Sequence, residues 1–249
     1  MSCGRWPSSS LSAGGTARFR GGYRTILYHR RGYGGSSPAS RPGSVARDAA
    51  DCRSLITTLE VGPAHVVGVG YSAAVGLHLA SWAPTSVHTL TVLEPPPVHV
   101  RSAPQSRAAN ARLAETLQAD GAIAALDEFL AMPVGRDWRS EAERRLTGSV
   151  AQMERDATTF FATDMPALLT WEFDADAAAR IGCPTLYVGG TESGPWFAEV
   201  RELILAWLTQ TEDTVIPGAG HSLALTHPAA VATAVVGFLR RHPMSAPIT

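Results

Sequence analysis

The sequence predicts an α/β protein, in which a mostly parallel sheet is flanked by helices and carries an inserted helical cap. Along most of the chain, short apolar runs alternate with longer amphipathic ones. The apolar runs themselves scarcely alternate in polarity, which is typical of parallel strands buried on both faces. Over residues 99–176 the strand-like runs stop and only helical periodicity remains. We therefore predict a sheet domain of residues 1–98 and 177–249, and a cap of residues 99–176.

Each element follows from one of these runs. Strands are expected at RTILYH, HVVGVG and VHTLTVLE before the cap, and at PTLYVGG and DTVIPGAG after it. Helices of the sheet domain are expected at SVARDAADCRSLITTLE, AAVGLHLASWA, WFAEVRELILAWLTQ and PAAVATAVVGFLRRH. In the cap, apolar residues recur every three or four positions in SRAANARLAETLQAD, GAIAALDEFLAM and WRSEAERRLTGSVAQMERDA, which predicts helices there as well.

The composition is that of a soluble globular protein, with 45% hydrophobic and 17% charged residues among 249. No stretch approaches the roughly 18 uninterrupted apolar residues that a membrane span needs. The opening residues MSCGRWPSSSLSAGG contain no apolar signal core. Cys3, Cys52 and Cys183 lie far apart, so neither a disulfide framework nor a metal site is predicted. We expect a cytoplasmic protein without a membrane partner.

Charge and motifs restrict the partners further. A net charge of -1 offers no electrostatic reason to expect nucleic acid as a partner. All 21 basic residues are arginines, which excludes lysine-based chemistry and, with the abundant Ala, Gly and Pro, suggests a GC-rich genome. The sequence shows no phosphate-binding glycine loop and no metal cluster. We expect a small-molecule substrate, no cofactor, no metal, and a monomer or homodimer.

One serine stands where a strand pattern meets a helix pattern, in GYSAA at residues 70–74. Ser72 in this context is typical of a nucleophile elbow, a strained turn that exposes the hydroxyl at its apex. Side chains two positions before and after the apex would collide, which accounts for the small Gly70 and Ala74. The following helix would point its free amides at the site and favour an oxyanion. The alternative is that Ser72 only caps that helix.

A histidine follows a short apolar strand and a glycine turn near the C-terminal end, in DTVIPGAGHS. A base at His221 would take the serine proton and later deliver it to the leaving group. His227 is the competitor, but it precedes Pro228 at an expected helix start and is interpreted as a surface residue. The remaining histidines, such as His65 and His78, are interpreted as structural or solvent-facing.

Four segments together resemble the α/β-hydrolase fold family: RRGYGGSS, GYSAA, PTLYVGGTES and IPGAGHS, in the family's order and spacing. The resemblance extends from about residue 20 onward and is weakest in the cap. It implies a Ser-acid-His triad on a parallel sheet with a helical lid, and Ser72 and His221 match the nucleophile and base positions.

The resemblance leaves two places for the triad acid. The common place, in the loop after PTLYVGG, holds Ser193 instead of an acid, with Glu192 next to it. The second place, at the end of LTVLEPPP, holds Glu94. We favour Glu94 as the carboxylate that orients His221, with Glu192 as the alternative acid and Ser193 as a possible assistant.

The chain departs from the family pattern at two points. His29 stands where the family has an Asp before the RRGYGGSS loop, so we expect that loop to be held differently. In addition, residues 1–22 offer no obvious source for the strand expected between RTILYH and HVVGVG. The family's second oxyanion amide would be lost with that strand, at a cost of about a hundredfold or more in turnover. The amide of Ala73 would remain.

Large apolar side chains of the cap and of the loop after the fourth strand could line a pocket over the serine. Their alternative role is packing within the cap core. Together they favour a mainly apolar, small-to-medium substrate over a sugar or phosphate ester. The predicted lining residues are Tyr71, Phe160, Phe161, Met165, Leu168, Trp171, Trp196 and Phe197.

The leading hypothesis is a serine hydrolase that cleaves an ester, thioester or lactone through an acyl-enzyme on Ser72. The second hypothesis is a biosynthetic cyclase or other non-hydrolytic enzyme, in which His221 or Tyr71 supplies acid–base help. The third is a catalytically silent binding protein, which the pairing of Ser72 with His221 disfavours.

Overall fold

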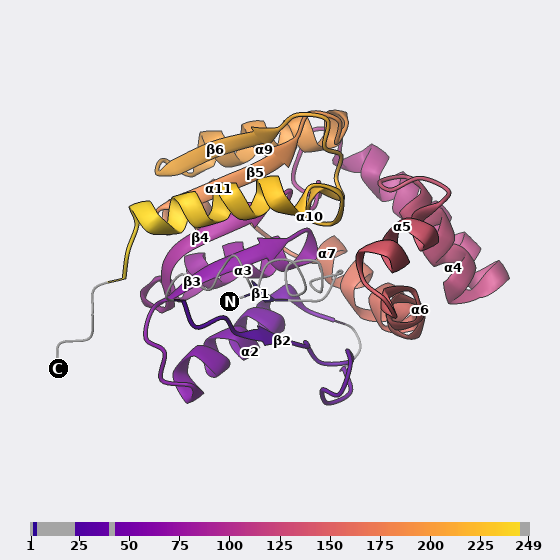
Figure 1. Cartoon of the computed structure of the whole chain (residues 1–249), viewed down its shortest axis with the longest axis horizontal. Helices are drawn as coiled ribbons and strands as arrows, with labels where there is room; N and C mark the ends of the chain where they lie inside the picture. The colour runs from indigo at the N-terminus through magenta and orange to yellow at the C-terminus, as the bar shows by residue number, and fades with distance from the viewer. Residues whose placement is uncertain (1, 4–22, 40–42, 245–249) are drawn as a thin grey trace.

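The sheet is parallel throughout the part of the chain that the computed structural model describes, residues 2–3, 23–39 and 43–244. Within these residues six strands lie in the order β2-β1-β3-β4-β5-β6 (Figure 1). The predicted α/β class is confirmed. The strands are β1 (Ser2–Cys3), β2 (Leu27–Tyr28), β3 (Ala64–Val69), β4 (Val87–Leu93), β5 (Thr185–Gly190) and β6 (Thr211–Ile216).

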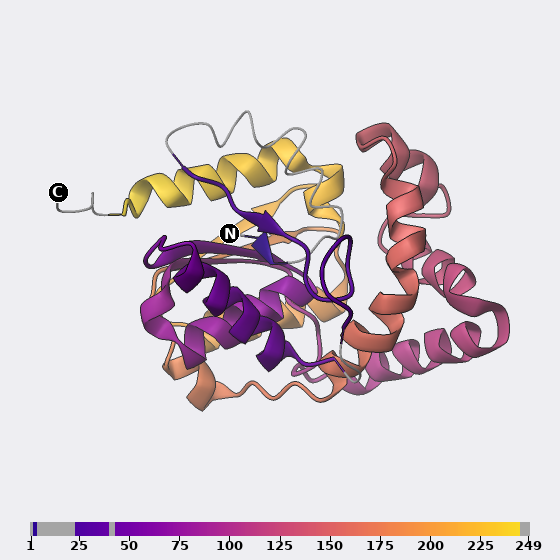
Figure 2. The same ribbon diagram turned by 90° about the horizontal axis from the view of Figure 1, so that it is seen from below.

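Helices cover both faces of the sheet. Successive strand residues point to opposite faces, and apolar side chains on both faces need to be buried. Leu90 and Tyr187 pack with α2 (Val45–Thr58), α3 (Tyr71–Trp82), α8 (Ala175–Ala179) and α9 (Pro195–Trp207). Leu93 and Val188 pack on the other face, with α10 (Leu223–Thr226) and α11 (Pro228–Arg241). Figure 2 shows α11 on one side of the sheet and α2 with α3 on the other. A short 3-10 turn, Pro84–Ser86, leads from α3 into β4.

The strand expected to be missing has a counterpart at the start of the chain. Ser2 pairs with Leu27 of β2 and with Val67 of β3, and Cys3 pairs with Tyr28, all in parallel register. The expectation that residues 1–22 supply no such strand is therefore wrong. It failed because a two-residue strand leaves no periodic pattern to recognise. Residues 4–22, which follow this strand, lie outside the described residues, and the expected loss of the second oxyanion amide falls on them.

Residues 103–169, which lie in the segment predicted as a cap and are called the cap below, form a group of helices. They have an apolar core of their own, which includes Leu113, Leu126, Trp138 and Phe161. Both views show α4, α5 and α6 beside the sheet domain, beyond one end of the strands (Figures 1 and 2). The elements are α4 (Ala103–Ala131), which breaks at Gly121, α5 (Trp138–Arg145), α6 (Ser149–Thr159), a π-helical turn (Phe160–Asp164) and α7 (Met165–Leu169). Among the described residues, no helix is both long and apolar enough to cross a bilayer.

A buried arginine joins the cap to the sheet domain. Arg30, in the loop after β2, donates to Asp48 Oδ2 of α2 at 2.7 Å and to Asp164 Oδ1 of the cap at 3.0 Å. Tyr33 donates its hydroxyl to Asp164 and Tyr71 donates its hydroxyl to Asp48. Burial favours neutral groups, but the adjacent carboxylates overcome it and hold the pKa of Arg30 well above its ordinary value.

Further hydrogen bonds hold the loop that follows β2, in which His29 replaces the family's Asp. The backbone carbonyl of His29 accepts a hydrogen bond from Ser36 Oγ at 2.6 Å, and Gly32 N–H donates to the carbonyl of Ser37 at 2.8 Å. From the cap, Thr159 Oγ1 donates to the carbonyl of Gly32 at 3.0 Å. The loop is thus closed by hydrogen bonds within itself and fastened to the cap.

Replacing Arg30 by Met should destabilise the protein strongly, because Asp48 and Asp164 would stay buried without their cation. We expect a loss of about 3–5 kcal/mol in the free energy of unfolding. The neighbouring Arg31→Met is the control, since Arg31 pairs with Asp51 in a more exposed position and its loss should cost under about 1 kcal/mol. Urea unfolding measures both. Equal small losses in the two variants would contradict a structural role for the Arg30 cluster.

The buried His65 makes the stability of the protein depend on pH. Burial, with help from the nearby His88, lowers the pKa of His65 from 6.5 to about 4. The unfolded chain therefore takes up a proton below pH 6.5 that the folded protein refuses until about pH 4, so stability falls as the pH drops through this window. In His65→Asn, urea midpoints measured between these pH values should fall less steeply than in the wild type. Parallel slopes would show that His65 protonates freely in the fold.

Candidate active site

The carboxyl ends of the parallel strands β3, β4, β5 and β6 lie along one edge of the sheet, where loops can hold reactive side chains. Gly70, directly after β3, donates its N–H to the carbonyl of Leu93 in β4 at 2.9 Å. Glu94 follows β4, and Gly190 ends β5. The turn after β6 carries His221, and the close approach of Gly190 to Ala219 O leaves no room for a side chain at position 190. These contacts place Glu94 and His221 together.

Glu94 and His221 form a hydrogen-bonded pair. Glu94 Oε2 lies 2.8 Å from His221 Nδ1, and Glu94 Oε1 accepts the N–H of Gly190 at 2.8 Å. The carboxylate is 1% exposed, and its backbone has a positive φ of 42°, a strained conformation for a residue other than glycine. Because Nδ1 faces a carboxylate, it carries the proton and leaves Nε2 free to accept one.

The two alternatives at the other acid position form no hydrogen bond with the imidazole among the described residues. Glu192 is exposed, and its backbone N–H donates to the carbonyl of Ala219 at 2.8 Å. Ser193 Oγ is buried and has no hydrogen-bond partner among the described residues. Of the three candidates, the structure therefore brings Glu94 to His221.

The strained apex of the strand-to-helix turn is Gly70, not Ser72. Gly70 has φ 53° and ψ −119°, and α3 begins with the next residue. A Cβ at Gly68 would lie 2.3 Å from the backbone oxygen of Ser72, so the close approach across the turn joins positions 68 and 72. The prediction that Ser72 is the apex is wrong by two residues. Gly70 is needed for its positive φ and not to avoid a collision, since the space around a Cβ there is open.

Ser72 instead lies in the first turn of α3. It is the second residue of the helix and is 5% exposed. Both Ser72 and His221 lie in the described part of the chain, and no hydrogen bond joins Ser72 Oγ to the imidazole. The arrangement does not present Ser72 as a nucleophile paired with a base.

The free amides at the start of α3 also differ from those expected. Ala73 N–H, predicted as the oxyanion donor, donates to the carbonyl of Gly70 at 2.9 Å, so that amide is occupied. The amide directly after the apex belongs to Tyr71, and it has no acceptor among the described residues. A helix N-terminus with such an amide favours an anion. Tyr71 N–H, not Ala73 N–H, is the amide available for an oxyanion.

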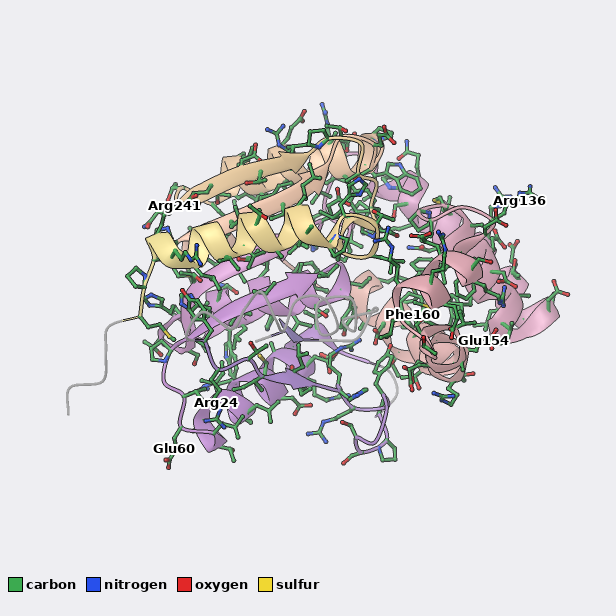
Figure 3. The ribbon with its side chains drawn as sticks, viewed as in Figure 1. Arg24, Glu60, Arg136, Glu154, Phe160 and Arg241 are labelled. Carbon is green, nitrogen blue, oxygen red and sulfur yellow. The ribbon has the colours of Figure 1, made fainter. Side chains whose placement is uncertain are left out.

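Most of the predicted pocket residues pack elsewhere. The Tyr71 hydroxyl donates to Asp48 at 2.8 Å beneath Arg30, and burial raises the pKa of Tyr71 well above its ordinary value, so it is not an acid–base group for the site. Phe160 and Phe161 lie in the cap core, and Figure 3 labels Phe160 on the side of the cap nearer the sheet domain in that view. Met165 packs on the cap core, Leu168 and Trp171 pack in the sheet domain's core, and Trp196 is half-buried.

Phe197 is the predicted pocket residue that contacts the pair. Its ring lies flat against the imidazole of His221, with 4.0 Å between ring centroids and 16° between planes. Phe197 comes from the first turn of α9, directly after the loop that holds Ser193.

A family model described as the alpha/beta hydrolase family matches residues 3–234. The chain belongs to the alpha/beta hydrolase family. A thermophilic esterase from Thermogutta terrifontis is 19% identical, with a TM-score of 0.79 over 97% of this chain and 89% of that one. A hydrolase from Pseudomonas aeruginosa is 25% identical, with a TM-score of 0.76 over 92% and 84%. An enol-lactonase from Burkholderia xenovorans is 20% identical, with a TM-score of 0.72 over 93% and 86%.

Within this alpha/beta hydrolase, sequence reasoning missed the true apex although a signal was present. Small residues recur at every second position in Gly68, Gly70, Ser72 and Ala74, so two registers of the small-x-apex-x-small pattern fit equally well. We chose the later register because Ser72 is the only serine among residues 68–74. In the earlier register, Gly68 to Ser72, the central residue is Gly70, which indicated that an apex without a side chain also fits the sequence.

Installing a serine at the apex should create the nucleophile that the turn lacks. Gly70→Ser has open space for its Cβ, and we expect its positive φ to cost about 1–3 kcal/mol of stability. The new hydroxyl would stand at the elbow apex, so a fluorophosphonate probe should label Gly70→Ser at residue 70, as read by peptide mass spectrometry. Gly70→Ala carries the same strain without the hydroxyl and should stay unlabelled, as should the wild type. An adduct on Ser72 in the wild type would contradict the assignment of the apex.

Proposed function

We propose that the protein hydrolyses an ester or lactone of a small, mainly apolar molecule, with His221 as general base for a water molecule. The observation that carries this proposal is the Glu94–His221 hydrogen bond beside an apex that is glycine. Family membership and similarity to an esterase and an enol-lactonase support hydrolysis as the reaction class. The aromatic face of Phe197 beside the base supports an apolar substrate.

The proposed reaction needs no covalent intermediate. His221 Nε2 takes a proton from water as its oxygen attacks the substrate carbonyl, and Glu94 stabilises the imidazolium that forms. The N–H of Tyr71 stabilises the oxyanion of the tetrahedral intermediate. As the carbon–oxygen bond to the leaving group breaks, His221 returns the proton to the departing alkoxide. An acid and an alcohol result, or a hydroxy acid from a lactone.

The acyl-enzyme mechanism proposed from the sequence is not retained. It requires Ser72 at the apex and paired with His221, but Ser72 lies two residues past the apex and forms no hydrogen bond with the imidazole. A water molecule is small enough to stand over Gly70, where a serine hydroxyl would otherwise be.

A second candidate is a non-hydrolytic reaction, such as cyclisation of a reactive intermediate, with His221 as proton acceptor and donor. Gly70 favours this candidate too, because such a reaction also proceeds without an attacking side chain. The two differ in whether water is consumed.

Kinetics on p-nitrophenyl acetate, p-nitrophenyl butyrate and a δ-lactone test the proposal. His221→Gln should lower kcat/KM by a factor of about 100 or more, since it removes the base. Ser72→Ala should stay within a few-fold of the wild type, and so should His227→Gln, the matched histidine control. Turnover that Ser72→Ala abolishes would contradict water attack. Absence of turnover on all three substrates would favour the non-hydrolytic candidate.

A further inference from the structure

We propose that Phe197 is a positioning residue, which fixes the plane of the His221 imidazole and thereby the direction in which Nε2 points. This deepens the proposed function, and its kinetic consequence rests on that function. Its structural consequence does not, because the orientation of the imidazole can be measured without a substrate.

A single hydrogen bond does not orient a ring. The bond between Glu94 Oε2 and His221 Nδ1 holds one ring atom, and small rotations about the Cα–Cβ and Cβ–Cγ bonds of His221 still tilt the imidazole around that contact. The imidazole is also 27% exposed, so solvent offers Nδ1 and Nε2 competing partners. Phe197 contacts the flat face of the ring, with 4.0 Å between centroids and 16° between planes. An edge contact and a face contact together define the plane of the base.

Phe197 is itself held from below. Gly194 has φ 86° and lets α9 begin sharply with Pro195, which brings Phe197 into the helix's first turn. The hydroxyl of Tyr187, a residue of β5 that is 1% exposed, donates to the carbonyl of Phe197 at 3.4 Å. The aromatic side chain is therefore anchored by its backbone to the buried strand β5.

The same strand anchors the acid. Gly190, at the end of β5, donates to Glu94 Oε1, and a Cβ at Gly189 would meet both the Tyr187 ring and Glu94 Oε1. Both contacts of His221 thus originate from one strand end, through Gly190 to Glu94 and through Tyr187 to Phe197.

The stacking contact gives a magnitude for the test. Aromatic pairs in favourable geometry stabilise the packed state by a factor of about 2 to 12. Without the ring of Phe197, the population in which the Glu94–His221 bond is open should rise by this factor. Nδ1–H exchanges with water from that open state, so its exchange rate should rise equally.

The experiment is proton and nitrogen NMR on the full chain with labelled histidine. In Phe197→Leu we expect the Nδ1–H signal of His221 to exchange about 2- to 12-fold faster than in the wild type. Phe197→Tyr, which keeps the ring, should restore the wild-type rate. Phe129→Leu, which removes a ring from the cap core, should leave the rate unchanged. Equal exchange in Phe197→Leu and the wild type would overturn the proposal.

Kinetics separate this proposal from the proposed function. With an ester substrate, Phe197→Leu should lower kcat by a similar factor and change KM less, because orientation of the base matters in the transition state. Faster exchange in Phe197→Leu, with no ester turnover by any variant, would sustain the positioning role and overturn hydrolysis. Unchanged exchange in Phe197→Leu, with intact ester turnover, would overturn the positioning role and sustain hydrolysis.

Discussion

The contact on which the arrangement of the molecule depends is the buried guanidinium of Arg30 between Asp48 and Asp164. One carboxylate belongs to α2 of the sheet domain and the other to the cap, so a single side chain joins two bodies that have separate apolar cores. Buried charges cost several kcal/mol each unless they are paired and hydrogen-bonded. This cluster therefore helps to hold the cap against the sheet domain, since displacement of Asp164 would leave charges buried and unpaired.

The same cluster reaches the candidate site through Tyr71. Its hydroxyl is held by Asp48, and its ring lies under Arg30 with 4.2 Å from the guanidinium carbon to the ring centroid. Tyr71 is also the first residue after the apex, so its anchored side chain holds the start of α3 over Gly68. The position of the backbone N–H that faces the site thus depends on a buried ion cluster connected to the cap.

The sequence predicts most of the fold because the signals for strands and helices are local. Apolar runs and helical periodicity identify β3, β4, β5 and the helices around them. The choice of Glu94 as the acid beside His221 comes from the family resemblance, which also leaves Glu192 open. Two features escape this reasoning. Ser2–Cys3 is too short to carry a pattern, and its strand exists only through pairing with β2 and β3. The apex escapes because residue types at alternate small positions do not determine which one adopts a positive φ.

Gly70 and Glu94 both have positive φ, and their contrast bears on the chemistry. A residue other than glycine in that region costs about 1–3 kcal/mol. At position 70 the chain avoids this cost with glycine, and with it any apex side chain. At position 94 the chain accepts the cost, and the buried carboxylate it retains is the one that holds His221. The chain keeps a strained residue where the side chain has a partner, and has glycine where a nucleophile would stand. This contrast supports the proposal that the site works through its base.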